Sequence, residues 1–488
     1  MDCPPKRRQT VKWSRVLTFA PLVAFVLTSC GGNSLVANRG SAALPDAKRK
    51  AGGSSKFIKH VVIVIQENRS FDDFFATFPG ADGATGGCMV PPPGSGSGSG
   101  SGGCPKGDEY VPLQAVPLIE PCDFGHGRRP YLQDYDGGAM DGFGLAGNGP
   151  AKCGPGKAGK DAYQYVIPSQ IQSYWSIAQQ YVLGDHMFQT QGSGSFTAHQ
   201  DLIAGTTTYD PAKTRSLVDY PSHMPWGCDA PSGTKTTILI DMGSYLKSEW
   251  HKGPFPCMDY PTLRDLLDAH GVSWKYYSPP EPGGDGKLWN AFDAIRNVRR
   301  GPEWTVNIAH NKVFFNDVAA NKLANVSWVV PDTDNSDHPG GHHDTGPSWV
   351  ASIVNAIGES SYWNTTAIVV VWDDWGGFYD HVPPPFFDTW GGLGFRVPML
   401  LVSPYARETS TGKPGYISHT RYEFGSILKF VEQNWNLGTL GATDERAASL
   451  MDCFDFTLGP RPFTLIPAKY SRSYFLRQPY SYKPVDTE

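Results

Sequence analysis

Several features that would point to a function at once are missing from this sequence. There is no excess of positive charge, because 42 Lys and Arg residues stand against 47 Asp and Glu residues, and the formal net charge is -5. Nucleic acid binding usually needs a basic surface, so we expect no nucleic acid partner. No CxxC pair occurs, which argues against a zinc site built from thiolates. No internal repeat is visible either.

Long apolar runs are scarce as well. The one clear run is VLTFAPLVAFVLTS at 16–29, which is short for a membrane span, and no other segment approaches about 18 consecutive apolar residues. A basic stretch, KRRQTVKWSR at 6–15, precedes it, and small residues close it just before Cys30. This order is typical of a secretory signal peptide. We therefore predict a signal peptide over residues 1–30 and export from the cell.

The end of the apolar run, Leu27-Thr28-Ser29-Cys30, resembles a bacterial lipobox. Cys30 is then either lipidated, which tethers the chain to a membrane, or left as a spare thiol after simple cleavage. Polar GGNS follows at once and supplies a linker, which favours a lipoprotein of the cell envelope over a freely secreted protein. Residues 31–55 are rich in Gly, Ser, Ala and Lys, and we predict a flexible linker there.

Seven cysteines follow Cys30, and an exported chain meets an oxidising compartment, so we expect disulfides. Sequence alone does not fix their pairing, but short separations favour Cys88–Cys104, Cys122–Cys153 and Cys228–Cys257, with Cys453 left over. The low-complexity stretch PPPGSGSGSGSGG at 91–103 lies between the first two. It is predicted to form a disulfide-closed surface loop.

Apolar runs of strand length alternate with helical patterns along the rest of the chain. Runs expected of buried parallel strands lie at His60–Gln66, Ser327–Val330, Thr366–Trp372 and Pro398–Ser403. Helical patterns lie at Ile171–Tyr181, Thr262–His270, Pro347–Ile357 and Tyr422–Trp435. The alternation predicts an α/β fold whose central, mostly parallel sheet is flanked by helices, in a single domain over 56–488 with long loop insertions.

Acidic groups directly follow two of the predicted strands. Glu67-Asn68 follows the first strand, and Asp373-Asp374 follows the strand that ends at Trp372. Ligands collect beyond the carboxyl ends of strands in open α/β sheets, so these side chains are expected to face one crevice. The carboxylates would repel one another unless they were protonated or neutralised by a cation, and oxygen ligands suit a hard or borderline divalent ion. For either pair alone, a helix cap or a solvated turn is the alternative.

A candidate nucleophile lies in the small-residue loop GSGSFTAH at 192–199. Ser195 would be exposed at a helix start there, where backbone N–H groups favour an anionic phosphoryl group. The alternative is an ordinary Gly/Ser turn.

Histidines cluster in a second Gly/Pro-rich loop, SDHPGGHHD at 336–344. Loop imidazoles could bind phosphate oxygens or protonate a leaving group, and His338 is the main candidate, ahead of His342 and His343. His381 follows the acidic pair at 373–374 within one loop and could complete a phosphate pocket. Further candidates are His126 and His419, and a structural histidine is the alternative for each.

Three motifs carry a resemblance to a known family. Glu67-Asn-Arg-Ser-Phe-Asp72, WDDWGGFYDHVPPP at 372–385 and RVPMLLVSPYA at 396–406 resemble the bacterial phosphoesterase family that groups phospholipases C with respiratory-burst-inhibiting acid phosphatases. Further motifs follow the family order: DFGH (123–126), GSFTAH (194–199), DYPTLRDLLDAHGVSWKYY (259–277), SDHP (336–339) and SHTRYEFGSILKFVE (418–432). The resemblance spans residues 57–456.

The family resembles a branch of the alkaline-phosphatase-like superfamily. That resemblance implies the corresponding fold, one divalent metal ion of open identity, a metal-bound hydroxyl nucleophile and a covalent phospho-enzyme intermediate. The implied metal ligands are Glu67, Asn68, Ser195, Asp373 and Asp374, and Ser195 would also attack phosphorus. The implied phosphate-site residues, with catalytic roles, are His126, His338 and His381.

The nucleophile motif departs from the family pattern. The family often has Ser-Phe-Pro-Asn-His or Gly-Pro-Thr-Asn-Pro-Asn there, whereas this chain has Ser-Phe-Thr-Ala-His. Ser195 is matched to the nucleophile of the family by the His199 that follows it and by the IAG at 203–205.

The expected function is hydrolysis of phosphate esters, and two substrate classes compete. Long phospholipases C of the family carry extra carboxy-terminal domains, whereas only residues 457–488 follow the last motif here, which favours an acid-phosphatase-like enzyme acting on monoesters. The alternative is a phospholipase C that cleaves phospholipid diesters. A catalytically inactive lipoprotein binding module is a further alternative, and a sulfatase ranks last because no CxPxR-type motif occurs. The oligomeric state is left open.

Overall fold

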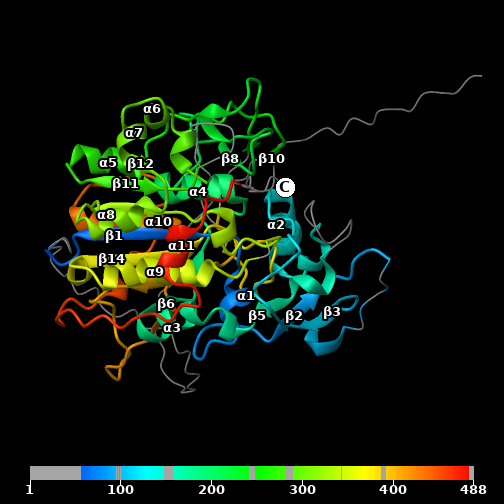
Figure 1. The fold of residues 1–488 in the computed structure, drawn as a ribbon. Helices are drawn as coiled ribbons and strands as arrows, with labels where there is room; N and C mark the ends of the chain where they lie inside the picture. The colour runs from blue at the N-terminus through cyan, green and yellow to red at the C-terminus, as the bar shows by residue number, and fades with distance from the viewer. Residues whose placement is uncertain are drawn as a thin grey trace, which may run out of the picture. The chain divides into compact units, whose positions relative to one another are not determined.

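The β-branched run at the start of the domain forms β1 (His60–Gln66), a central strand of an eight-stranded sheet (Figure 1). The computed structural model describes residues 56–94, 96, 98, 100–147, 158–240, 248–280, 289–341, 343–385 and 392–482. Their contacts group them into the unit Gly52–Glu488. The predicted signal peptide and linker, residues 1–30 and 31–55, lie outside the described residues, as does Cys30.

The other strands are β2 (Gly86–Met89), β3 (Glu109–Pro112), β4 (Gln114–Val116), β5 (Gln164–Val166), β6 (Val182–Gly184), β7 (Met187–Phe188), β8 (Ser216–Val218), β9 (Thr237–Leu239), β10 (Ser248–Glu249), β11 (Trp274–Tyr277), β12 (Ile308–Ala309), β13 (Val326–Val329), β14 (Thr366–Trp372), β15 (Met399–Val402), β16 (Tyr416–Ser418) and β17 (Tyr422–Glu423). The α-helices are α1 (Phe71–Phe75), α2 (Arg128–Tyr135), α3 (Gln172–Gln180), α4 (Ser195–Ala204), α5 (Leu263–Ala269), α6 (Arg296–Arg299), α7 (Glu303–Asn307), α8 (Val313–Ala319), α9 (Gly346–Gly358), α10 (Phe424–Trp435) and α11 (Arg472–Arg477).

The central sheet has the order β12-β11-β13-β1-β14-β15-β6-β16 and is mostly parallel, which confirms the predicted fold class. β1 pairs in parallel with β13 and β14, and β6 pairs in parallel with β16. β15 alone is antiparallel to both of its neighbours, β14 and β6. Because β15 is antiparallel to both β14 and β6, β6 runs in the same direction as β14. The strands β1, β14, β6 and β16 therefore all end at the same edge of the sheet.

Helices cover both faces of this sheet. Trp372 lies level with Gln66 on β1 and packs against Tyr174 of α3, with ring centroids 4.9 Å apart. Trp328 lies level with Ile63 on β1, and its indole N–H donates to the Leu202 carbonyl of α4. Side chains alternate between faces along a strand, so positions 63 and 66 point to opposite faces. The helices α3 and α9 therefore lie on one face, with α4 and α10 on the other.

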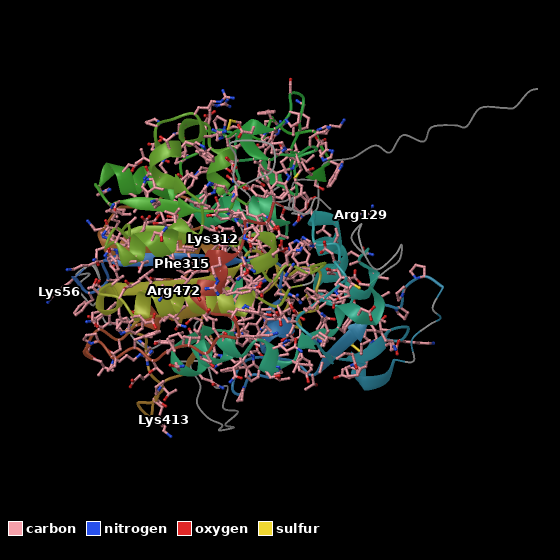
Figure 2. The ribbon with its side chains drawn as sticks, viewed as in Figure 1. Lys56, Arg129, Lys312, Phe315, Lys413 and Arg472 are labelled. Carbon is pink, nitrogen blue, oxygen red and sulfur yellow. A yellow bond between two sulfur atoms is a disulfide. The ribbon has the colours of Figure 1, made fainter. Side chains whose placement is uncertain are left out.

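The apolar core fills the space between the sheet and these helices. All seven residues of β14 are buried, as expected of a strand covered on both faces. Charged side chains such as Lys56, Arg129 and Lys413 are exposed and point away from this core (Figure 2). No helix within the described ranges is both long and apolar enough to span a bilayer.

The predicted strands and helices are present, with small shifts at their ends. β1 and β14 have the predicted bounds, whereas β13 begins one residue earlier than predicted, at Val326. The helix α10 begins at Phe424 because Tyr422–Glu423 pairs with β7. The Glu423 side chain then caps the helix in a capping box with Ser426.

Disulfides close two of the long loop insertions, as predicted. Cys88 pairs with Cys104 and Cys228 pairs with Cys257. Cys122 is also disulfide-bonded, but Cys153, its predicted partner, lies outside the described residues. Cys453 is buried and free, which matches its place as the cysteine left over.

Candidate active site

Paired strand ends bring the two acidic motifs together. Gln66 and Trp372 are partners at the ends of β1 and β14, so Glu67-Asn68 and Asp373-Asp374 leave the sheet side by side. The Asn68 backbone N–H donates to Asp373 Oδ1 over 3.0 Å, and its side-chain Nδ2 donates to Asp374 Oδ1 over 3.1 Å. All four side chains are fully buried. The predicted convergence of these groups is therefore present in the structure.

A strained turn holds this arrangement in place. Asn68 has a left-handed φ of 58°, and Gly376 has a φ of 63°. A Cβ atom at Gly376 would lie 2.3 Å from the Asn68 carbonyl oxygen. The Gly376 N–H also donates to Asp374 Oδ1 over 2.8 Å. Only glycine allows the loop after β14 to approach the loop after β1 this closely, and such strain is common at functional sites.

Ser195 reaches the same centre from the other direction. It is the first residue of α4, and Gly194 before it is extended, so the hydroxyl projects from the helix start. Ser195 Oγ donates to Asp374 Oδ2 over 3.2 Å, and its side chain is buried. The structure thus brings the predicted nucleophile to the predicted metal ligands.

The electrostatics of this centre would suit a bound cation. Burial first, and then the charge of Glu67, raises the pKa of Asp373 to about 7. Burial and the charge of Asp373 raise the pKa of Asp374 to about 8, and burial raises the pKa of Glu67 well above its usual range. Glu67 Oε2, Asn68 Oδ1 and Asp373 Oδ2 are buried and have no hydrogen-bond partner among the described residues. Unpartnered oxygens of this kind are the ligands that divalent ions prefer.

Two of the predicted histidines lie beside these ligands. His126 is fully buried, and its Nε2 lies 2.9 Å from Asn68 Nδ2 while its Nδ1 lies 2.8 Å from the Phe124 carbonyl oxygen. Since Asn68 Nδ2 can only donate, Nε2 accepts and Nδ1 carries the proton in this arrangement. The ring of His338 lies 5.9 Å from that of His126. The structure therefore places His126 against Asn68 and His338 next to His126.

His381 lies in a neighbouring cluster instead. Its Nδ1 is 2.7 Å from Asp72 Oδ2, and its Nε2 is 3.4 Å from Asp82 Oδ1. Arg396 bridges this group, because its guanidinium donates to both oxygens of Asp380 and reaches Asp72 at 3.4 Å. Burial acts to lower the pKa of His381, but the hydrogen bond and charge of Asp72 outweigh it, and the pKa is raised. The side chains that contact His381 are therefore different from those that contact Asp374.

Of the remaining candidate histidines, the two that the structure describes have their partners elsewhere. His343 pairs with Asp334 at 3.1 Å on the surface, and His342 lies outside the described residues. His419 contacts Asp185 at 2.7 Å, beyond β15.

His199 is a site residue that the sequence used only as an alignment marker. It follows Ser195 by one helical turn on α4, so both side chains project from the same face. His199 Nε2 lies 3.0 Å from Glu67 Oε1 and 3.8 Å from Asp373 Oδ2. Burial lowers the pKa of this imidazole, which favours its neutral form. The i, i+4 spacing from the predicted nucleophile was the signal that could have identified it.

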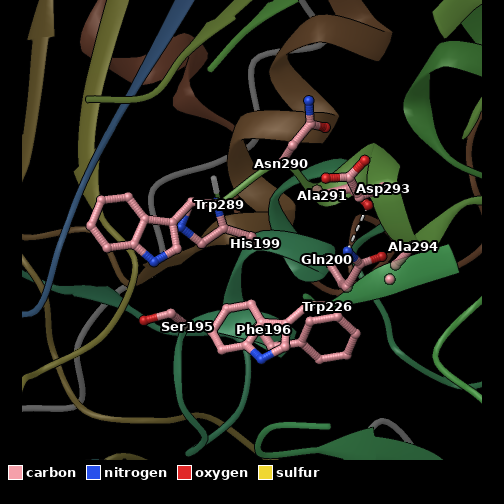
Figure 3. Close-up of a pocket in the computed structure, with 11 residues that line it drawn as sticks. Ser195, Phe196, His199, Gln200, Trp226, Trp289, Asn290, Ala291, Asp293 and Ala294 are labelled. Carbon is pink, nitrogen blue, oxygen red and sulfur yellow. Dashed lines mark hydrogen bonds between the residues drawn. The ribbon is translucent and has the colours of Figure 1, made fainter. Parts of the chain in front are cut away.

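Aromatic side chains form a wall beside Ser195 and His199 (Figure 3). Trp226 packs edge-on against Phe196, and Trp289 stacks on His338 with ring centroids 6.1 Å apart. The pocket that they line opens onto α4, where Gln200 is held by a 2.8 Å hydrogen bond to the Ala291 carbonyl. The three apolar side chains Phe196, Trp226 and Trp289 are largely buried and pack directly next to the polar centre.

A family model matches most of the chain. The profile of the Phosphoesterase family matches residues 58–438, a range that contains every one of the residues described above as ligands, nucleophile or flanking histidines.

Curated relatives are phospholipases C. The chain is 24% identical to the non-hemolytic phospholipase C of Pseudomonas aeruginosa over 462 residues, covering 86% of this chain and 60% of that protein. It is 28% identical to phospholipase C B of Mycobacterium tuberculosis over 284 residues, covering 48% of this chain and 53% of the relative. The chain thus spans less than two thirds of these relatives. A solved structure of a protein in the alkaline phosphatase superfamily from Vibrio parahaemolyticus aligns with a TM-score of 0.31 and 11% identity, over 58% of this chain and 65% of that one.

Proposed function

Because the chain belongs to the Phosphoesterase family, we propose that it hydrolyses phosphate ester bonds with Ser195 as the nucleophile. The observation that carries this proposal is the buried hydroxyl of Ser195, 3.2 Å from Asp374 and next to unpartnered ligand oxygens. A binding protein without catalysis has no need of a buried hydroxyl held against carboxylates. This contrast favours an enzyme over an inactive lipoprotein module.

The donor set fits one divalent metal ion, whose identity stays open. The proposed ligands are Glu67, Asn68, Ser195, Asp373 and Asp374. The three unpartnered oxygens among them, all buried, support this assignment. When bound, the ion would neutralise the carboxylates and lower the pKa of a coordinated hydroxyl group.

The protein groups suggest how protons move during the reaction. Ser195 Oγ attacks phosphorus, its proton passes to Asp374 Oδ2, which already accepts its hydrogen bond, and the ester bond to the departing alcohol breaks. His338 donates a proton to the departing oxygen. Water then attacks the phosphoserine, its proton returns to His338, and the proton on Asp374 returns to Ser195. Phosphate monoester or inorganic phosphate leaves, and the enzyme is restored.

The start of α4 and His126 would hold the phosphoryl group during these steps. The first N–H groups of a helix have no acceptor within the helix, so the start of this ten-residue helix favours a negatively charged ligand. His126 contacts Asn68, with Nε2 2.9 Å from Asn68 Nδ2, and adds a polar group beside the proposed ligands. Because the contacts of His381 run to Asp72 and Asp82, we assign the phosphate-lining role to His126 and His338 and give His381 a supporting role.

For the substrate, we propose a phospholipid diester. Two observations support this choice: the relatives are named phospholipases C, and the wall of Trp226, Phe196 and Trp289 offers apolar contact next to the nucleophile. Acid-phosphatase-like cleavage of monoesters stays a prediction and is measured in the same assay. A membrane tether through Cys30 would place such a site near its lipid, and that tether also stays a prediction.

The test is a side-by-side assay of purified protein on phosphatidylcholine vesicles and on p-nitrophenyl phosphate. We expect turnover to disappear after chelation and to return with one divalent ion, with the faster rate on the phospholipid. Equal or faster turnover of p-nitrophenyl phosphate would support the monoester alternative. Absence of turnover on both substrates across a series of divalent ions would contradict the proposed reaction.

A further inference from the structure

A second group of ligand-type side chains lies at the same edge of the sheet, beyond β15. Asp185 directly follows β6, and His419 directly follows β16. These strands are parallel neighbours, with Ser418 paired to Gly184, so the two residues leave the sheet together. This is the relationship that brings Glu67 and Asp373 together at the ends of β1 and β14. The group of Asp82, Asp185, His186 and His419 is called the β6–β16 cluster below.

The distances in the β6–β16 cluster suit a small metal ion. His419 Nδ1 lies 2.7 Å from Asp185 Oδ2, and His186 Nδ1 lies 3.4 Å from Asp185 Oδ1. One ligand atom from each of these three residues lies within 4.8 Å of the others. Ligands held tetrahedrally at about 2.0–2.1 Å from zinc are about 3.3 Å apart, which is close to these separations.

An unpartnered buried oxygen points into the cluster. The Asp185 side chain is fully buried, and its Oδ2 accepts hydrogen bonds from the Asp82 backbone N–H and from His419. Its Oδ1 makes no hydrogen bond to any residue that the structure describes, and His186 Nδ1 lies 3.4 Å from it. Leaving a buried carboxylate oxygen unsatisfied is costly, and a bound cation would remove that cost.

His186 is already oriented as metal-binding histidines usually are. Its Nε2 lies 2.9 Å from Asp82 Oδ2, so this carboxylate can accept the proton of one ring nitrogen while the other faces Asp185. The facing Nδ1 also lies 3.2 Å from the His419 carbonyl oxygen, which accepts a hydrogen bond from it and which an ion bound to Nδ1 would replace as its partner. The His419 side chain is 60% exposed and that of His186 is 23% exposed, so an ion can enter from solvent.

We propose that Asp185, His186 and His419 bind a second divalent ion, with Asp82 orienting His186. Two imidazoles and one carboxylate suit a borderline transition ion such as Zn²⁺ better than Mg²⁺ or Ca²⁺. The donor set differs from the oxygen-rich centre around Asp374, so the two sites should differ in metal preference. The bound ion would clamp the segments after β6 and β16 to the loop that carries Asp82, which stabilises the fold.

The test counts ions in the full-length protein rather than turnover. Chelator-stripped protein is titrated with Zn²⁺ by calorimetry, and bound zinc per chain is measured by elemental mass spectrometry after dialysis. His419→Gln is the first variant, because this side chain is exposed and the variant should fold. We expect it to bind one ion fewer than the parent protein, or to bind that ion at least about tenfold more weakly. His186→Gln should give the same loss.

A matched control and an independent readout make the outcomes distinct. His223 is exposed and lies outside the cluster, so His223→Gln should retain the full zinc count. Zn²⁺ should raise the thermal midpoint of the parent protein by more than it raises that of His419→Gln. Retention of the full count and affinity in either cluster variant would overturn the proposal. Each comparison measures the number of bound zinc ions. It therefore tests the second metal site even if the protein does not hydrolyse phosphate esters.

Discussion

Ser195 Oγ donates a hydrogen bond to Asp374 Oδ2 over 3.2 Å, although 179 positions separate the two residues in the chain. Ser195 begins α4, which covers one face of the sheet, and Asp374 lies two positions beyond the end of β14. A helix start and a strand end thus meet at the edge where the parallel strands finish. This contact joins the proposed nucleophile to the proposed metal ligands.

Replacing the nucleophile should remove catalysis without unfolding the protein. Ser195→Ala deletes one oxygen, so we expect kcat on either phosphate ester to fall by roughly 10⁴-fold or more while the thermal midpoint changes little. Ser352 is a buried serine of α9 whose hydroxyl bonds to the Ser348 carbonyl, and Ser352→Ala is the matched control. Turnover of Ser195→Ala within tenfold of the parent rate would remove Ser195 from the mechanism.

The close approach at Gly376 gives a second prediction. In Gly376→Ala the new Cβ would clash with the Asn68 carbonyl oxygen and strain a backbone at φ 63°, so stability should fall by roughly 1–3 kcal/mol and turnover should fall steeply. Denaturant unfolding and the ester assay measure the two effects.

Gly438 is the control for that substitution, because it has a φ of 88° but no atom lies within 4 Å of the position that a Cβ would take there. Gly438→Ala should therefore lose stability through backbone strain while keeping full turnover. If both variants lost activity equally, the contact between Gly376 and Asn68 would not be the cause.

Glu432 on α10 should make stability depend on pH. Burial first, and then the charge of Asp444, raises the pKa of Glu432 to about 8 from an ordinary value near 4.5. The folded state therefore binds this proton more tightly than the unfolded state. The stabilising contribution of protonated Glu432 is fully present below about pH 4.5 and is lost as the pH rises through about 8.

Glu432→Gln tests this directly, because the amide oxygen can still accept the 3.0 Å hydrogen bond from the Leu440 N–H. We expect the fall in thermal midpoint between pH 5 and pH 9 to be smaller in this variant than in the parent protein. Glu359→Gln, at a half-exposed glutamate after α9, is the control for replacing a carboxylate by an amide. An identical slope in Glu432→Gln and the parent would contradict the prediction.

The aromatic wall predicts a difference between substrates. Trp226→Leu removes the ring that packs on Phe196 and Tyr220, so kcat/KM on phosphatidylcholine should fall by about tenfold, while p-nitrophenyl phosphate should be affected less. Trp250 is 54% exposed, and Trp250→Leu is the control for loss of an indole ring. Equal losses on both substrates would show that Trp226 does not contact the lipid portion.

Much of the site could be predicted because its residues sit next to local signals. The runs that became β1 and β14 are continuous and β-branched, and polar residues end both of them, so Glu67 and Asp374 could be placed at strand ends from sequence alone. Ser195 was found by its small-residue loop and by motif order. His199 was overlooked as a site residue because a histidine inside a helix carries no local sign of what it faces.

His381 shows where sequence reasoning stops. It lies eight positions after Asp373, yet the chain turns between them, and the Asp72 and Asp82 carboxylates hold its ring in the neighbouring cluster. Distance along a loop does not determine direction in space. The partner of a loop side chain depends on contacts with segments far away in the sequence.

The sequence by itself determined four of the eight strands of the central sheet, the polar groups that follow β1 and β14, and the order of the family motifs. It could do so because strand propensity and apolar patterning act over a few neighbouring residues. Only the tertiary structure decided which strands are neighbours. It placed antiparallel β15 between β14 and β6, set Ser195 against Asp374, and brought Asp185 beside His419. The strand order and these contacts depend on how helices from distant parts of the chain bury the two faces of the sheet. No local sequence pattern encodes that packing.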